Sequence, residues 1–119
     1  MAKLPNCDSA VVADAKLTDY LLNPVHPSGG PKARFLISFG FASDRMEVAR
    51  AALLEHARMH EVTAVVQDAF GTIFEVSGPL SSPDGRNPVV TTVWMLDTGA
   101  IAPRLITMLP RRPSTRRQP

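Results

Sequence analysis

The sequence holds a single cysteine and no long apolar run, and each shortage excludes a class of protein. Cys7 has no partner within the chain, which rules out intramolecular disulfides and cysteine-based metal sites. No apolar run approaches the roughly 20 residues needed to cross a bilayer, and the opening MAKLPNCDSA lacks the apolar stretch of a signal peptide. We therefore expect a cytoplasmic protein without a membrane partner.

Several enzyme signatures are missing as well. No serine stands in a G-x-S-x-G elbow, and the carboxylates are scattered singly, unlike those of a two-metal nuclease. His56 and His60 have the four-residue spacing of a metal-binding helix, but the Ala-Arg-Met between them gives no H-E-x-x-H motif. We expect only an exposed helix end there, and neither a metal site nor a cofactor.

The composition predicts one folded domain with a basic extension. The 119 residues are 45% apolar and 20% charged, as in globular proteins. Residues 1–108 carry nine Lys or Arg against eleven Asp or Glu, a net charge of −2, whereas residues 109–119 add four arginines. We expect a single domain over residues 1–110 and an unpacked basic tail over residues 111–119. The tail is either a solubilising extension or a source of weak, salt-dependent attraction to RNA or DNA.

Three helices are predicted in the first half of the chain. Leu17, Tyr20 and Leu21 share one face of a helix that begins near residue 14. A second helix begins at Pro31 and ends near residue 40. The third opens at residues 44–47 with the spacing of a capping box and continues to about residue 60.

The second half of the chain changes to strand-like sequence. Branched and aromatic residues form runs that are separated by turn-forming residues such as those in SSPDGRNP. Strands are predicted over residues 62–67, 72–77, 89–96 and 104–109. The fold class is therefore α+β, with about three amino-terminal helices packed on one face of a four-stranded antiparallel sheet.

The segment NPVHPSGGPK, residues 23–32, combines an imidazole and an ammonium with a glycine-rich turn that begins a helix. Backbone N–H groups at Gly29 and Gly30 could face a phosphate, with Lys32 adding positive charge, although the spacing of a P-loop is absent. The alternative is a plain helix–helix connection in which His26 packs against the helices and Lys32 is solvated.

The spacing of several motifs resembles an uncharacterised bacterial domain family associated with toxin systems. KLTDYLLNPVHPSGGPKA, an F-G hairpin and PRLITMLP match that family's K-L-x-x-Y-L-L-N-x-x-H-P-x-G-x-x-K-A, its Y-G or F-G hairpin and its R-L-x-T-x-x-P strand, over residues 3–110. The family in turn resembles ribonuclease toxins of the barnase, EndoU, colicin and RelE type. In those enzymes amino-terminal helices precede a four-stranded antiparallel sheet.

The resemblance implies a metal-independent ribonuclease that cleaves RNA by attack of the ribose 2′-hydroxyl on the adjacent phosphate. The catalytic residues would be His26 as general acid or base, Lys32 and Arg104 as stabilisers of phosphoryl charge, and Thr107 as a holder of a phosphate oxygen. RNA and a cognate antitoxin or immunity protein are the expected partners. The chain departs from the family at Phe70, where a tyrosine is frequent, and at its MLP ending, where AYP or VYP is usual.

Two other functions stay open at the level of the sequence. A non-enzymatic interaction protein, such as an immunity or antitoxin-like partner, needs only a packed surface, and a small phosphate-binding module needs only the GGPK turn. The nuclease needs His26 near Lys32 and open to solvent. In a regular strand Arg104 and Thr107 point to opposite faces, so without a bulge only one of them lines a given site.

Overall fold

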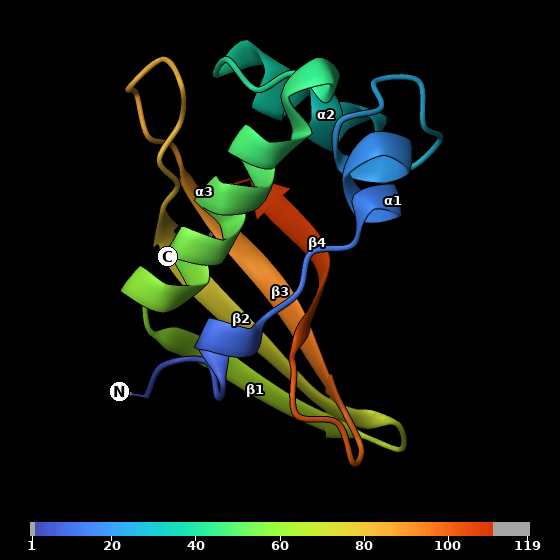
Figure 1. Cartoon of the computed structure of the whole chain (residues 1–119), viewed down its shortest axis with the longest axis vertical. Coiled ribbons are helices and arrows are strands. Elements are labelled where there is room, and N and C mark those ends of the chain that lie inside the picture. The colour runs from blue at the N-terminus through green and yellow to red at the C-terminus, as the bar shows by residue number, and fades with distance from the viewer. Residues whose placement is uncertain (1, 111–119) are drawn as a thin grey trace, which may run out of the picture.

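A layer of helices covers one face of a single sheet in the computed structural model, which describes residues 2–110 (Figure 1). The predicted tail, residues 111–119, lies outside the described residues. The helical layer consists of η1 (Cys7–Ser9), α1 (Asp14–Lys16), η2 (Leu17–Leu21), α2 (Gly30–Ser38), η3 (Ser43–Arg45) and α3 (Met46–Met59). All three predicted helices are present, and the first is α1 continued into the π-helical turn η2.

Four strands form the sheet in the order β1-β2-β3-β4, each antiparallel to its neighbour. The strands are β1 (Val62–Asp68), β2 (Gly71–Pro79), β3 (Val89–Asp97) and β4 (Arg104–Pro110). Runs of branched and aromatic residues joined by short turns favour this meander, because neighbouring strands can then pair directly. The predicted α+β class, with helices on a four-stranded antiparallel sheet, is confirmed.

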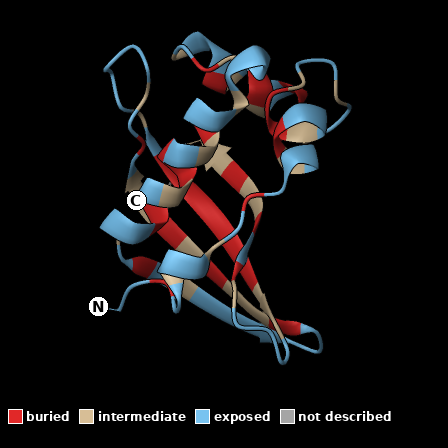
Figure 2. Ribbon diagram, in the orientation of Figure 1, coloured by how far each residue is buried: buried red, intermediate tan, exposed pale blue. Residues whose placement is uncertain are grey.

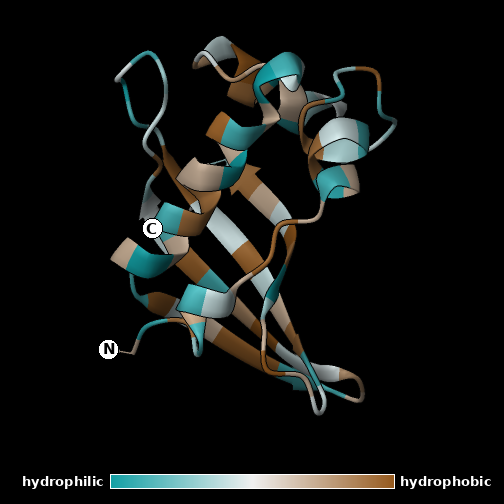
Figure 3. Ribbon diagram, viewed as in Figure 1, coloured by the Kyte–Doolittle hydropathy of each residue, from teal (hydrophilic) through white to brown (hydrophobic). Residues whose placement is uncertain are grey.

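The core lies between the sheet and the helices. Trp94 at the centre of β3 is fully buried, and large apolar side chains from α3 and η2 pack in the same cluster. Figure 2 shows buried residues on the strands beneath α3, and Figure 3 shows hydrophobic residues on the same strands. Each fully buried leucine contributes about 1.5–3 kcal/mol relative to exposure, so the cluster fixes how the helices sit on the sheet.

A β-bulge interrupts the pairing of β4 with β3. Val93 pairs with Thr107 and the next residue, Trp94, pairs with Leu105, which leaves Ile106 as the extra residue. The bulge shifts the alternation of the strand by one position. Arg104 therefore lies on the same sheet face as Thr107, although regular alternation predicts opposite faces.

Two local predictions are wrong. The capping box expected at residues 44–47 is not formed, because no side chain caps α3 and Glu47 forms an ion pair with Arg50 instead. His56 does not lie at an exposed helix end, since its exposed fraction is only 2%. Within residues 2–110, no helix is both long and apolar enough to cross a membrane.

Candidate active site

Lys32, Tyr20 and Thr107 form a closed triangle of hydrogen bonds where the helical layer meets β4. The Nζ of Lys32 donates to the Tyr20 hydroxyl at 2.8 Å and to Oγ1 of Thr107 at 2.7 Å, and the two hydroxyl oxygens lie 2.9 Å apart. All three side chains are half-buried. Among the ion pairs recorded for residues 2–110, none joins Lys32 to a carboxylate. Its recorded partners are thus the oxygens of a tyrosine and a threonine.

The π-helical turn η2 positions Tyr20. The amide of Leu22 donates to the carbonyl of Leu17 at 2.8 Å, five residues back, and Leu17 and Leu21 are fully buried. The wide turn keeps both leucines in the core while the ring of Tyr20 reaches toward β4. Single π-helical turns are frequent at functional sites, because they re-aim a side chain that a regular helix would point elsewhere.

The two glycines of the HPSGG loop are required by close packing. A Cβ on Gly29 would lie 2.4 Å from Cδ1 of Tyr20, and one on Gly30 would lie 2.7 Å from the carbonyl oxygen of Pro24. Their amides are already used, because Gly29 donates to Nδ1 of His26 at 2.8 Å and Gly30 donates to the His26 carbonyl at 2.9 Å. The loop therefore holds its amides inward, whereas a phosphate cradle would need them free.

His26 organises this loop and contacts the triangle through Tyr20. Its Nδ1 accepts the amides of Ser28, at 3.0 Å, and of Gly29, so these hydrogen bonds place the ring proton on Nε2. The ring packs against that of Tyr20 with centroids 5.1 Å apart and planes at 76°. His26 is half-buried. The imidazole and the Lys32 ammonium thus both contact the same tyrosine.

The electrostatics of the site centre on the Tyr20 hydroxyl. Burial raises the pKa of this phenol, but the hydrogen bonds from Lys32 and Thr107 and the positive charges of Lys32 and Lys16 outweigh it, and the pKa lies below the ordinary value of 10.0. The Nζ atoms of Lys16 and Lys32 each lie 5.3 Å from the centroid of the ring. Two cations therefore flank one phenol.

The structure does not bring Arg104 into the triangle. Its guanidinium forms two hydrogen bonds to Asp97, at 2.8 and 3.1 Å, beside the turn between β3 and β4. These bonds lower the pKa of the Asp97 carboxyl and raise that of Arg104. Phe70, with 74% of its surface exposed, lies in the turn between β1 and β2 at the same end of the sheet, where its carbonyl accepts the amide of Thr98.

A second polar chain lies inside the core and involves His56. Nε1 of Trp94 donates to Oγ1 of Thr92 at 2.8 Å, Thr92 is 3.0 Å from Nδ1 of His56, and Nε2 of His56 is 3.0 Å from the carbonyl of Gly78. Burial lowers the pKa of His56 to about 4, so the ring is neutral. Among residues 2–110 no group of three or more His, Cys, Asp or Glu is placed to hold a metal ion. The structure therefore assigns His56 a role in packing.

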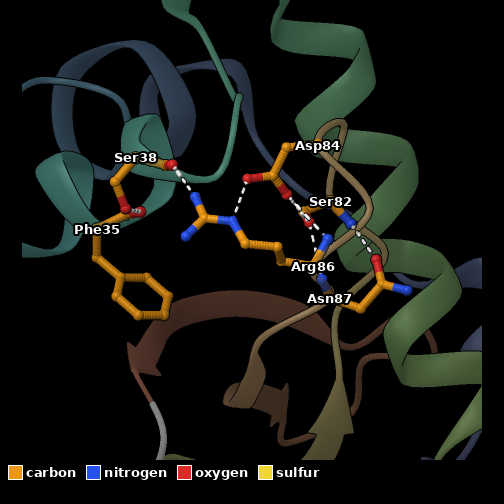
Figure 4. Close-up of polar contacts among 6 residues, drawn as sticks. All are labelled: Phe35, Ser38, Ser82, Asp84, Arg86 and Asn87. Carbon is orange, nitrogen blue, oxygen red and sulfur yellow. Dashed lines mark hydrogen bonds and ion pairs between the residues drawn. The ribbon is translucent and has the colours of Figure 1, made fainter.

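Arg86 anchors the loop between β2 and β3 against the end of α2 (Figure 4). Its Nε is 2.6 Å from Asp84, its guanidinium donates to the carbonyl of Ser38, and its charge lies 4.3 Å from the centroid of the Phe39 ring. The amide of Asp84 also donates to the Phe39 carbonyl at 3.2 Å. These contacts hold α2, the helix that carries Lys32, at its far end.

Sequence reasoning misses Tyr20 as a site residue, because its spacing with Leu17 and Leu21 places it on an apolar helix face. Two signals point to it. The hydroxyl of a tyrosine that is drawn toward the core needs a hydrogen-bond partner, and Tyr20 is the only tyrosine of the chain. Lys16, on the same helical segment, is also missed, because its place beside the Tyr20 ring follows only from the structure.

Fold and site together define an α+β domain whose helices place a lysine, a tyrosine and a threonine against the last strand of an antiparallel sheet. The chain belongs to the family described as Domain of unknown function (DUF6883), which matches residues 3–112. No curated protein matches it. A chain from the contact-dependent growth inhibition toxin–immunity protein complex of Klebsiella pneumoniae 342 has a similar structure, with a TM-score of 0.69 and 20% identity over 86% of this chain and 100% of that chain. This likeness shows a shared fold.

Proposed function

We propose that this domain is a metal-independent endoribonuclease of a bacterial toxin system. The observation that carries the proposal is the Lys32 ammonium held 2.7 Å from Thr107 and 2.8 Å from Tyr20 without a recorded carboxylate partner among residues 2–110. A cation that has no recorded carboxylate partner can bind an anionic ligand. The shared fold with a chain from a toxin–immunity complex supports the same class, and a cognate immunity or antitoxin protein would then be the partner.

RNA suits such a site because the substrate brings its own nucleophile. The 2′-hydroxyl attacks the adjacent phosphorus, and Lys32 and Thr107 stabilise the charge that develops on the phosphoryl oxygens. His26 contributes the N–H of Nε2 as a hydrogen-bond donor. Arg104 remains ion-paired with Asp97. It would therefore contact only an RNA that is long enough to reach the turn between β3 and β4. No step of this chemistry needs a metal ion.

Controlled expression tests the function in cells. The wild type is induced beside Lys32→Ala and beside Arg58→Ala, a control that removes one positive charge from the exposed side of α3. Growth arrest with fragmented RNA is expected for the wild type and for Arg58→Ala, whereas Lys32→Ala is expected to leave growth and RNA intact. Circular dichroism of the purified variants checks that each is folded. Normal growth and intact RNA with the wild type would contradict the proposal.

A second function, a non-enzymatic partner protein, is favoured by the β1 edge of the sheet, where among residues 2–110 the recorded backbone hydrogen bond from outside the sheet is that of Val62 to Ala2. The edge of β4 is covered, because Val11 exchanges backbone hydrogen bonds with Pro103 and Leu105 at 2.9 Å. On the other edge, Val65 and Val66 of β1 have exposed fractions of 55% and 54%. Figure 2 shows most of this strand exposed, and Figure 3 shows hydrophobic residues along part of it. Exposed apolar edge strands pair readily with strands of other proteins, so intact RNA in the expression test would favour this function.

A further inference from the structure

We infer that Tyr20 is the residue that takes the proton from the attacking hydroxyl in this site, and that His26 is a hydrogen-bond donor with no free lone pair for that task. The inference rests on the proposed ribonuclease function. It names a catalytic residue that the pattern of histidine, lysine and threonine leaves out.

The lone pairs of His26 are not available to a substrate. Nδ1 faces two amide hydrogens, from Ser28 at 3.0 Å and from Gly29 at 2.8 Å, and Ser28 Oγ lies 3.3 Å from the same atom. Nε2 carries the ring proton as a consequence. A general base must present a free lone pair within hydrogen-bond reach of the proton that it removes. His26 presents an N–H group on the side where Nε2 points.

The Tyr20 oxygen, in contrast, is surrounded by donors. The Lys32 ammonium donates to it at 2.8 Å, and the Thr107 hydroxyl lies at 2.9 Å with a proton that it can donate to Tyr20 or, over a longer 3.4 Å, to the carbonyl of Met108. A phenolate accepts both bonds, whereas a phenol must use one of these directions for its own proton. The titratable groups that face Tyr20 are Lys16 from α1, Lys32 from α2 and His26 from the loop, and β4 contributes the neutral Thr107. The two lysines favour the anionic oxygen.

The proton transfers balance over one turnover. The Tyr20 phenolate takes the proton of the 2′-hydroxyl as the O2′–P bond forms, the P–O5′ bond breaks, and the Lys32 ammonium gives a proton to the leaving 5′-oxygen. The products are a 2′,3′-cyclic phosphate and a free 5′-hydroxyl. Tyr20 is left as a phenol and Lys32 as an amine, and one proton passing back along their 2.8 Å hydrogen bond restores the starting pair. No co-reactant is consumed.

The ionisation of Tyr20 can be measured without any substrate, because it is the only tyrosine in the chain. Absorbance at the tyrosinate band is followed against pH in the wild type, in Lys32→Met and, as a blank, in Tyr20→Phe. The expected wild-type midpoint lies below 10.0, and Lys32→Met raises it. A wild-type midpoint at or above 10.0 that Lys32→Met leaves unchanged would overturn the inference. The fluorescence of Trp94, recorded in parallel, shows where alkaline unfolding begins.

Cleavage of a labelled RNA oligonucleotide by the purified full chain then tests catalysis. Tyr20→Phe keeps the ring that packs on Gly29, and we expect it to bind RNA normally, to cleave it about 100-fold more slowly or worse, and to lose the rise of rate with pH. Ser38→Ala, which removes a hydroxyl at the far end of α2, is the matched control. Wild-type cleavage by Tyr20→Phe would overturn the inference and leave the proposed function standing. A wild type that cleaves nothing despite a lowered midpoint would overturn the proposed function, and the catalytic role of Tyr20 with it.

Discussion

Gly29 lies directly against Tyr20, with room for no side chain between them. An added Cβ would be 2.4 Å from Cδ1 of the tyrosine and 2.9 Å from its carbonyl oxygen. The glycine-rich turn, which in the sequence resembles a phosphate-binding element, therefore works by letting a loop approach an aromatic ring. The hydroxyl of the same tyrosine is hydrogen-bonded to Lys32 and Thr107, so the loop packs directly against the Lys32–Tyr20–Thr107 triangle.

Gly29→Ala is expected to displace the Tyr20 ring and to lower the free energy of unfolding by about 1–3 kcal/mol, the usual cost of overpacking. Urea denaturation measures the change. In a Tyr20→Ala background the same substitution should cost less, because the ring that it contacts is gone. Equal costs in the two backgrounds would show that the close contact does not determine the effect.

His26 should matter first to the stability of the loop. His26→Ala leaves the amides of Ser28 and Gly29 without their acceptor, and we expect it to lower the free energy of unfolding by about 1–2 kcal/mol. His26→Asn offers a carbonyl oxygen to amides two or three residues on and should recover part of the loss. Thermal melts of the three proteins compare them. An alanine variant as stable as the wild type would rule out this structural role.

The buried ring of His56 should make the free energy of unfolding depend on pH between about 4 and 6.5. Burial lowers its pKa to about 4 in the folded state, against an ordinary value of 6.5, so between these values the unfolded chain binds more protons. The stabilisation is complete above pH 6.5 and is lost as the pH falls toward 4, by roughly 3 kcal/mol in all. The pKa values of the Asp84 and Asp97 carboxyls are lowered from 3.8, so their effect on stability changes mainly below that pH. These two carboxyls therefore add little to the change between pH 6.5 and 4.

Urea denaturation at several pH values between 4 and 7 measures this loss. His60→Gln changes the neighbouring ring, whose centroid is 5.0 Å from that of His56, and should keep most of the dependence. A free energy of unfolding that stays level from pH 6.5 to 4.5 would show that His56 is charged at no cost in the folded protein. That result would contradict the buried neutral ring described above.

Arg86 offers a test of how the far end of α2 is held. Its side chain is 61% exposed, so the ion pair with Asp84 contributes little, and most of the effect comes from Phe39 and the carbonyl of Ser38. We expect Arg86→Ala to lower the free energy of unfolding by about 1 kcal/mol, measured by thermal melting. Arg45→Ala removes an equal charge beside α3 and serves as the control. Equal effects of the two substitutions would argue against a specific role for the Phe39 contact.

The sequence predicts the strands well because their signal is local. Branched and aromatic residues form runs in β2 and β3, and the loop between them contains proline, glycine and asparagine. The bulge at Ile106 carries no such signal, since neither glycine nor proline marks it, and it follows from pairing with β3. The strand pattern therefore predicts the sheet. It does not predict that Thr107 and Arg104 lie on the same face of that sheet.

The site could be predicted only in part, because its contacts span the chain. Lys32 and Tyr20 are 12 residues apart, and Tyr20 and Thr107 are 87 apart. Residue types and spacing predict His26 and Lys32 as site residues. Tyr20, which contacts both, is placed there by a π-helical turn, and residue propensities do not predict such a turn. The burial of His56 is missed for a similar reason, since its hydrogen-bond partners Thr92 and Gly78 lie on strands remote in sequence.

Cleavage of a defined RNA in the presence of EDTA tests the central claim most directly. Purified wild type and Lys32→Ala are incubated with an RNA oligonucleotide and with the same oligonucleotide carrying 2′-deoxyribose, and the product ends are identified by mass spectrometry. We predict that the wild type yields 2′,3′-cyclic phosphate ends from RNA only, and that Lys32→Ala yields almost none. Intact RNA after incubation with folded wild type, or equal cleavage of the deoxy substrate, would contradict the account.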